Sequence, residues 1–202
     1  MGKSIEEITI NAKNSDKTGV YGDIYQGLVI KEIPYYFERK ELIQDVVSVM
    51  LPIVFEEMDE KIKKLKYPAE GRPQYIKTSA DTTVNLCFSL LDQEITQQQI
   101  PYLRDQMRTM LMKVQPANIF FDNKVEQRED QTFAWFSYKA YTVDVPIYTH
   151  MFITNIDEKV LHGTFVCMYS DMELWKSAFK DIMLSVVDMK KENNHENSKG
   201  LY

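Results

Sequence analysis

Between residues 127 and 189 the order of hydrophobic and polar positions predicts one supersecondary unit. Three long strand-like segments, 132–143, 146–156 and 159–169, are joined by short turns. An amphipathic helix over 170–189 follows at once, and Ser170 with Glu173 has the spacing of a capping box. The pattern therefore predicts an antiparallel meander closed by a packing helix.

The first half of the chain alternates strands and helices in a similar way. Residues 42–51 and 83–91 have the alternation of strands, and the strand at 42–51 ends at Pro52. A short helix is predicted from the spacing of Phe55, Met58, Ile62 and Leu65. A longer helix is predicted over 100–114, with short strands at 119–121 and 125–129.

Together these elements predict an α+β fold, in which helices pack on the faces of an antiparallel β-sheet. A chain of 202 residues is long enough for one sizeable core. We expect residues 1–34 to be an N-terminal extension, either an extra strand or an arm, and 35–189 to be a single α+β domain. Residues 190–202 are almost without apolar side chains and are expected to be a disordered tail.

The element order and hydrophobic texture resemble the PsbP-like fold, which is shared with Mog-type Ran-binding proteins and with bacterial accessory proteins and effector-associated chaperones of secretion systems. Four segments carry the resemblance: MLPIVFEEM (50–58), the loop at 66–73, TVNLCFSLL (83–91) and TFVCMYSDMELWKSAFKDIMLSV (164–186). The resemblance covers about 42–188 and rests on no catalytic motif. It implies an α-β-α sandwich with a non-enzymatic role in binding a protein partner.

Composition and charge exclude several function classes. The net charge of −6 and the scattered basic residues argue against nucleic-acid binding, which needs a basic surface. No apolar run is long enough for a membrane span, and the N-terminus has no apolar segment typical of a signal peptide. Cys87 and Cys167 each lie within a predicted strand and are expected to be buried free thiols. These features favour a cytoplasmic location.

The search for catalytic motifs returns only weak candidates. The sequence has no glycine-rich phosphate loop, no nucleophile elbow and no metalloprotease helix motif. We therefore predict that the protein is not an enzyme and needs no cofactor. His150 and His162 lie on consecutive predicted strands and could share a sheet face, where Asp144 or Glu158 could add a carboxylate to a metal site. Ordinary cross-strand polar residues are the favoured interpretation, because a transition-metal site usually needs three or four protein ligands.

Aromatic side chains are dense between residues 133 and 152, and they occupy both parities of their strands. One parity must face the helices, so the other could present rigid rings to a partner. We predict a partner surface at the following residues: Trp135, Tyr138, Tyr141, Tyr148 and Phe152. Burial of all these rings beneath helices on both faces is an equally plausible arrangement.

The sequence thus predicts a non-catalytic protein-binding module, an adaptor or a secretion-effector-type chaperone, whose partner presents an apolar or amphipathic helix. Two alternatives stay open. One is a structural subunit that forms a homodimer through a self-complementary surface. The other is a domain that binds a small ligand or a metal.

Overall fold

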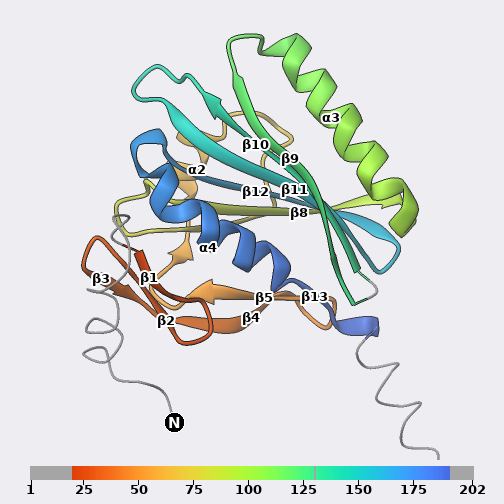
Figure 1. The fold of residues 1–202 in the computed structure, drawn as a ribbon, viewed down its shortest axis with the longest axis horizontal. Coiled ribbons are helices and arrows are strands. Elements are labelled where there is room, and N and C mark those ends of the chain that lie inside the picture. The colour runs from red at the N-terminus through yellow and green to blue at the C-terminus, as the bar shows by residue number, and fades with distance from the viewer. Residues whose placement is uncertain (1–19, 130, 192–202) are drawn as a thin grey trace, which may run out of the picture.

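A computed structural model describes residues 20–129 and 131–191, and it shows a seven-stranded antiparallel sheet at the centre of the fold (Figure 1). The strand order across this sheet is β6-β7-β8-β12-β11-β10-β9. Its strands are β6 (Glu56–Glu57), β7 (Tyr75–Thr78), β8 (Asn85–Glu94), β9 (Ile119–Arg128), β10 (Gln131–Ala140), β11 (Ile147–Ile156) and β12 (Lys159–Met168). The predicted α+β class and the antiparallel pairing of the meander are confirmed.

Two three-stranded sheets lie beside the large one. The first is a meander of β1 (Val20–Asp23), β2 (Gly27–Ile30) and β3 (Ile33–Tyr35). The second has the order β13-β5-β4 and contains β4 (Phe37–Ile43), β5 (Val47–Pro52) and β13 (Val187–Asp188). Three α-helices complete the described part of the chain: α2 (Glu60–Lys66), α3 (Ile100–Val114) and α4 (Met172–Leu184).

Helices cover both faces of the large sheet. Neighbouring residues of a strand point to opposite faces, so each strand contributes side chains to both layers. Phe152 of β11 faces α4 and belongs to the main core, which also contains Phe179 and apolar residues of β1 to β5. Ile153 faces the other side and packs with Ile100 of α3. On that same side α2 covers a small cluster around Cys87. Figure 1 shows α4 between the large sheet and the two small ones.

Helix α3 spans the predicted residues. The residues before it explain why it begins at Ile100. A turn of 3-10 helix over Gln97–Gln99 precedes it, and the Thr96 N–H donates to Gln99 Oε1 at 2.9 Å. Pro101 then falls in the first turn of α3, where its missing N–H leaves no hydrogen bond unmade.

The predicted strand 42–51 is wrong as a single element. Residues 44–46 form a turn in which Asp45 adopts a left-handed conformation, and Ile43 pairs with Val47 across it. Ile43 therefore ends β4 and Val47 begins β5. The alternation continues through the hairpin because both strands place apolar residues in the same core.

The predicted helix around 55–65 is shorter than expected, and the residues that it buries differ from the predicted apolar stripe. Phe55 precedes β6 and is buried in the main core, whereas the helix begins only after Asp59, whose Oδ1 accepts from the Lys61 N–H. Leu65 is 81% exposed, so it does not belong to an apolar stripe. The helix-like spacing of apolar residues therefore extends over two different elements, the segment before β6 and the helix α2.

The predicted helix 170–189 ends at Leu184. Ser185 stops it: its hydroxyl donates to the Ile182 carbonyl at 2.7 Å and accepts from the Met50 N–H at 2.9 Å. Val187 and Asp188 then pair with β5. The capping box predicted at Ser170 is also wrong, because Asp171 is the N-cap residue and no side chain caps the helix.

Two further boundaries differ from the prediction. The short strands predicted at 119–121 and 125–129 are one strand, β9, with a bulge opposite Ser137. The strand predicted over 132–143 ends at Ala140, and a loop follows. Residues 1–19 of the predicted N-terminal extension and most of the predicted tail lie outside the described residues.

Candidate functional site

A cleft of about 490 Å³ lies beside the C-terminal end of α3. It lies between the loop that leaves α3 and the ends of β10 and β11. Its lining residues are Gln115, Pro116, Ala117, Asn118, Tyr138, Ala140, Tyr141, Thr142, Ile147 and Thr149.

One wall of this region is the C-terminal part of α3, where residues of its apolar stripe become exposed. Ile100 at the start of the helix is fully buried, and Met107 in the middle is partly buried against Ile153 and its neighbours. Further along the same stripe, Met110 is 62% exposed and Val114 is 64% exposed. The apolar stripe of α3 is therefore buried at Ile100 and exposed at Met110 and Val114.

The floor of the cleft is aromatic and neutral. The Tyr138 ring packs against Phe120 and Phe136, with centroid distances of 5.4 and 5.9 Å. Burial raises the pKa of Tyr138, and its side-chain hydrogen bond with Thr149 opposes this only in part. The phenol is therefore protonated at neutral pH and contributes a hydroxyl, not a charge.

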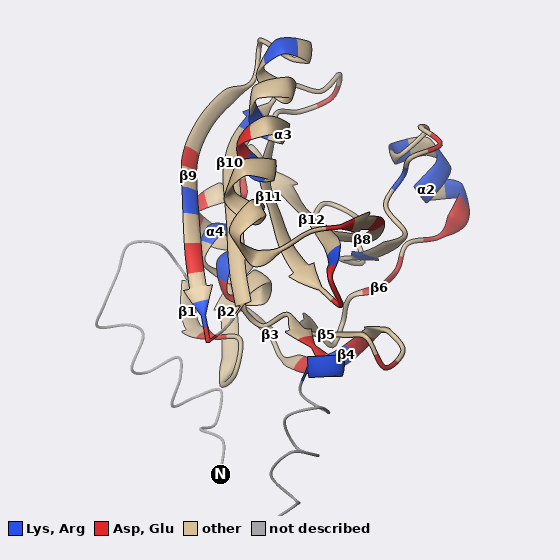
Figure 2. Cartoon of the chain, turned by 90° about the vertical axis from the view of Figure 1, so that its right-hand side faces the viewer, with Lys and Arg blue, Asp and Glu red and all other residues tan. Residues whose placement is uncertain are grey.

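The other wall is the loop between β10 and β11. Tyr141 is 56% exposed, and Val143 and Val145 are exposed as well. Lys113 is the one charged residue between 109 and 121, and Asp144 is the one between 140 and 153. Figure 2 shows how little charge this end of the fold carries. We call Met110, Val114, residues 115–118 and residues 141–145 the α3-end surface.

The structure separates the five residues of the predicted partner surface. Trp135, Tyr148 and Phe152 are buried in the main core beneath α4, and Tyr138 is buried at the floor of the cleft. Only Tyr141 is exposed, so the prediction that these five rings form an exposed surface is wrong for four of them in this conformation. The reason is that helices cover both faces of the sheet. Partner binding at Tyr141 stays a prediction.

The two candidate metal-binding histidines point to opposite faces of the sheet. His150 pairs with Phe165 and stacks on Trp135 at 4.6 Å, whereas His162 pairs with Ile153 on the α3 side. Burial lowers the pKa of His150 to about 3 and that of His162 to about 4. Within residues 20–129 and 131–191, no three His, Cys, Asp or Glu side chains come together as a metal site.

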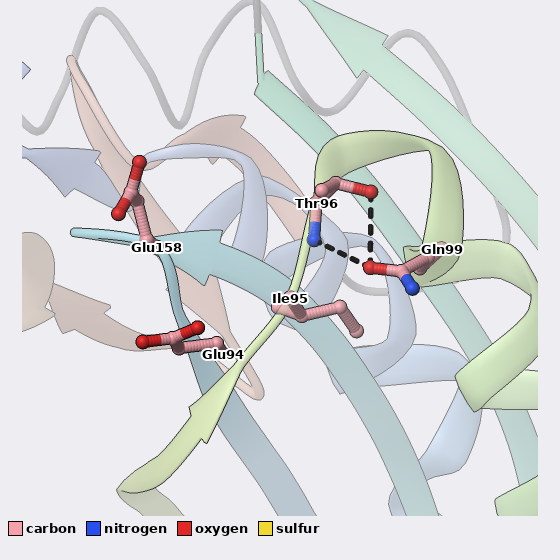
Figure 3. A pocket seen from close by; sticks show the side chains of 5 residues that line it. All are labelled: Glu94, Ile95, Thr96, Gln99 and Glu158. Atoms are coloured by element: carbon pink, nitrogen blue, oxygen red, sulfur yellow. Dashed lines mark hydrogen bonds between the residues drawn. The ribbon is translucent and has the colours of Figure 1, made fainter.

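A second pocket, of about 390 Å³, lies at the opposite end of α3 (Figure 3). Glu94, at the end of β8, and Glu158, in the turn between β11 and β12, both line it. Gln99 and Thr96 form its other side, and their polar groups bond to each other. Two carboxylates beside a helix start can attract a cation, but no third ligand of the described chain joins them.

Both thiols are protonated. Cys87 is buried under α2, where its Sγ lies 3.3 Å from the Tyr67 hydroxyl, and burial raises its pKa to about 12. Burial also raises the pKa of Cys167. A reactive cysteine needs a lowered pKa, so neither thiol has the surroundings of a nucleophile. Both are buried free thiols, as the sequence predicts.

Comparison with known proteins relates the chain to others by fold. No protein-family model and no curated protein matches it. Among solved structures, the cyanobacterial PsbP (CyanoP) of Synechocystis sp. PCC 6803 aligns with a TM-score of 0.56 at 13% identity, covering 75% of this chain and 92% of that one. This likeness supports a PsbP-like fold.

Two other structures align less closely. PA94 of Pseudomonas aeruginosa, a protein of unknown function described as a putative regulator, has a TM-score of 0.43 at 12% identity and covers 75% of this chain and 96% of that one. LpqN, involved in cell envelope biogenesis of Mycobacterium tuberculosis, has a TM-score of 0.48 at 10% identity, with coverages of 76% and 90%. At such identities a likeness concerns the fold alone.

The α3-end surface is the feature that the sequence prediction missed. The sequence places Met110 and Val114 on the apolar stripe of α3, but it does not show that the fold leaves them exposed. The described residues also contain no helix of the length and apolarity that crossing a bilayer requires.

Proposed function

We propose that the protein is a non-catalytic protein-binding module and that the α3-end surface is where its partner docks. One observation carries this proposal: the apolar stripe of α3 remains exposed at Met110 and Val114, directly before the loop that lines an open cleft. Contiguous exposed apolar surface is uncommon on monomeric domains and usually marks an interaction site.

The chemistry of the surface favours an apolar or amphipathic helix of another protein as the occupant. Met110 and Val114 precede the cleft-lining residues 115–118 in the chain, and Val143 and Val145 follow the cleft-lining residues 140–142, so exposed apolar side chains flank the cleft segments. A helix that lies along such a groove buries its own apolar face and leaves its polar face in water. Met110 suits this role, because methionine side chains adapt their shape to a partner.

The low charge of the surface supports the same occupant. Lys113 and Asp144 are the only charged residues of these segments, and Lys139 Nζ lies 4.8 Å from the centre of the Tyr141 ring, so few charged groups lose their hydration when the surface is covered. An adaptor or a secretion-effector-type chaperone acting in the cytoplasm is the biological role we propose. The PsbP-like fold is compatible with such a role but does not determine it.

Charge insertion on α3 tests the proposal. We expect Met110→Glu and Val114→Glu to abolish recovery of a co-purifying partner, because each places a carboxylate where apolar contact is needed. Met112→Glu is the matched control, since Met112 is also exposed on α3 but lies about 200° around the helix from Met110. Circular dichroism should show the same fold for all three variants.

Hydrogen exchange locates the contact. In the complex, amides of 109–118 and 141–147 should exchange more slowly than in the free protein, whereas those of α2 should not change. If the Met112→Glu control loses the partner as completely as Met110→Glu does, or if protection appears elsewhere, the α3-end surface is not the docking site.

A further inference from the structure

The outer edge of β9 is the longest unpaired strand edge of the described fold. β9 has ten residues and is the last strand of the seven-stranded sheet, with β10 on one side and no described strand on the other. Figure 2 shows it at one margin of the fold. Such an edge presents a row of backbone N–H and C=O groups that another strand can pair with.

The register of the β9–β10 hairpin determines which backbone groups face outward. Arg128 pairs with Gln131 and only two residues separate them, so this pair closes the turn with hydrogen bonds in both directions. Hydrogen-bonded pairs then recur at every second residue, at Glu126 and Lys124. The N–H and C=O groups of the residues between them, Asn123, Val125 and Gln127, therefore point away from β10.

The side chains of this edge alternate in charge. Asp122, Lys124, Glu126 and Arg128 follow one another at every second position, and Figure 2 shows them as alternating red and blue bands along β9. They share the face of the sheet that α4 covers: Asp122 Oδ1 lies 3.4 Å from Lys124 Nζ, and Glu126 Oε1 lies 2.8 Å from Lys180 Nζ of α4. The other face carries only uncharged side chains.

We propose that β9 pairs in antiparallel fashion with β9 of a second copy of this chain, about a two-fold axis through Val125. In this register Lys124 lies opposite Glu126 of the second copy, and Asp122 lies opposite Arg128. Asn123 lies opposite Gln127, and Val125 meets its own copy. Every charge then faces the opposite charge, and the two seven-stranded sheets become one.

The charges select this register. An axis through Val125 joins outward-pointing N–H and C=O groups, and it places the charged pairs at the non-hydrogen-bonded positions, where side chains lie closest. An axis through Lys124 or Glu126 would also use the outward-pointing backbone groups, but it would set like charges against each other. The bulge beyond Asn123 ends the regular stretch at the other side.

Charges on an edge strand often serve the opposite purpose, because they discourage pairing with other chains. Here the four charges alternate in sign and sum to zero, so an antiparallel copy centred on Val125 meets opposite charges, whereas a copy shifted by two residues meets like charges. The existing ion pairs with Lys180 and within β9 involve partly exposed side chains, and a carboxylate can accept from more than one donor. They are therefore compatible with the pairing.

Sedimentation of the full chain over a range of concentrations tests the proposal through a charge swap. The unaltered protein should show a reversible monomer–dimer equilibrium. Lys124→Glu or Glu126→Lys alone sets like charges opposite each other at two symmetric places, and we expect each to weaken dimerisation roughly tenfold or more. The double variant Lys124→Glu/Glu126→Lys restores opposite charges and should restore the dimer.

A backbone variant supplies the second test. Val125→Pro removes an outward N–H without touching the ladder to β10, so the monomer should fold and the dimer should be lost. Val125→Thr keeps the N–H and should still dimerise. A chain that is monomeric at all concentrations, or a dimer indifferent to the charge swap and to Val125→Pro, overturns the proposal. A dimer lost instead in Met110→Glu would assign the contact to the α3-end surface.

Discussion

Phe179 of α4 has the most central position among the side chains of the main core. It is fully buried, and its ring lies 5.8 Å from Trp175, 5.6 Å from Phe165 and 6.3 Å from Tyr148. We expect Phe179→Ala to lower the free energy of unfolding by about 3–5 kcal/mol, because the surrounding rings are held by the sheet and cannot fill the cavity.

Urea denaturation measures this loss, and Leu65→Ala is the control. Leu65 is an exposed residue on α2, so its truncation should change the free energy of unfolding by less than about 0.5 kcal/mol. A loss at Phe179 of under about 1 kcal/mol would mean that the core rearranges around the missing ring.

His150 makes the stability of the protein depend on pH. Burial lowers its pKa to about 3, and Lys180 adds a smaller effect in the same direction. In the unfolded chain the pKa is about 6.5, so the unfolded state binds the proton more readily. The stability due to neutral His150 is therefore complete above about pH 6.5 and is lost as the pH falls towards about 3.

Replacing the imidazole by a neutral amide should flatten this dependence. As the pH is lowered from 6.5 to 4, the free energy of unfolding of the unaltered protein should fall by up to about 1.4 kcal/mol per pH unit more than that of His150→Gln. Denaturation at pH 7, 6 and 5 provides the comparison, with both proteins referred to their own stability at pH 8. Equal slopes would show that His150 is protonated in the folded state.

At the scale of elements, Gly163 determines how β11 and β12 pack. It pairs with Phe152, and the Phe152 ring lies over it so closely that an added Cβ would be 2.0 Å from a ring carbon. Gly163→Ala must therefore displace a fully buried ring, and we expect a loss of about 1–3 kcal/mol or more in thermal or urea unfolding.

Gly71 is the matched control for this substitution, because an added Cβ there would meet no atom within 4 Å. Gly71→Ala should leave the stability within about 0.5 kcal/mol of the unaltered protein. If Gly163→Ala is equally harmless, Phe152 has another rotamer available and the meander is less tightly packed than it appears.

Elements with one uninterrupted period were predictable from the sequence, and elements that depend on distant partners were not. The stripe of α3 and the long strands of the meander follow from their own periodicity. The end of α4 depends on Ser185, which bonds to Met50 about 135 residues away in the chain. No local pattern distinguishes this serine from one inside a helix.

The candidate site was predictable only in part, for the same reason. Aromatic density predicted a partner surface on β10 and β11, but burial depends on which helix lies over which face. Tyr141 remained exposed because β10 ends at Ala140, one residue before it. The charge pattern of β9 is visible in the sequence, yet it gains meaning only once β9 is known to be an edge strand.

At the scale of the whole molecule, one core joins all three sheets. Residues 20–34 were expected to be an extension, and Leu28 of β2 is buried in the same core as Val49 of β5 and Phe179 of α4. Trp175 packs beside the junction between the expected extension and the domain, because its ring lies 5.2 Å from Tyr35, the last residue of β3, and 6.1 Å from Phe55. The division into an extension and a domain stays a prediction. The shared core favours a single folding unit.

We therefore expect residues 20–188 to unfold in one cooperative transition. The two tryptophans make this measurable, since Trp175 contacts the N-terminal strands and Trp135 lies in β10, stacked on His150. In the single-tryptophan variants Trp135→Phe and Trp175→Phe, the urea midpoint followed by fluorescence should coincide with the midpoint followed by circular dichroism of the same variant. Leu28→Ala should shift both probes equally, because it weakens the core that they share. If Leu28→Ala shifts the signal of Trp175 and leaves that of Trp135 unchanged, the small sheets open independently of the large one.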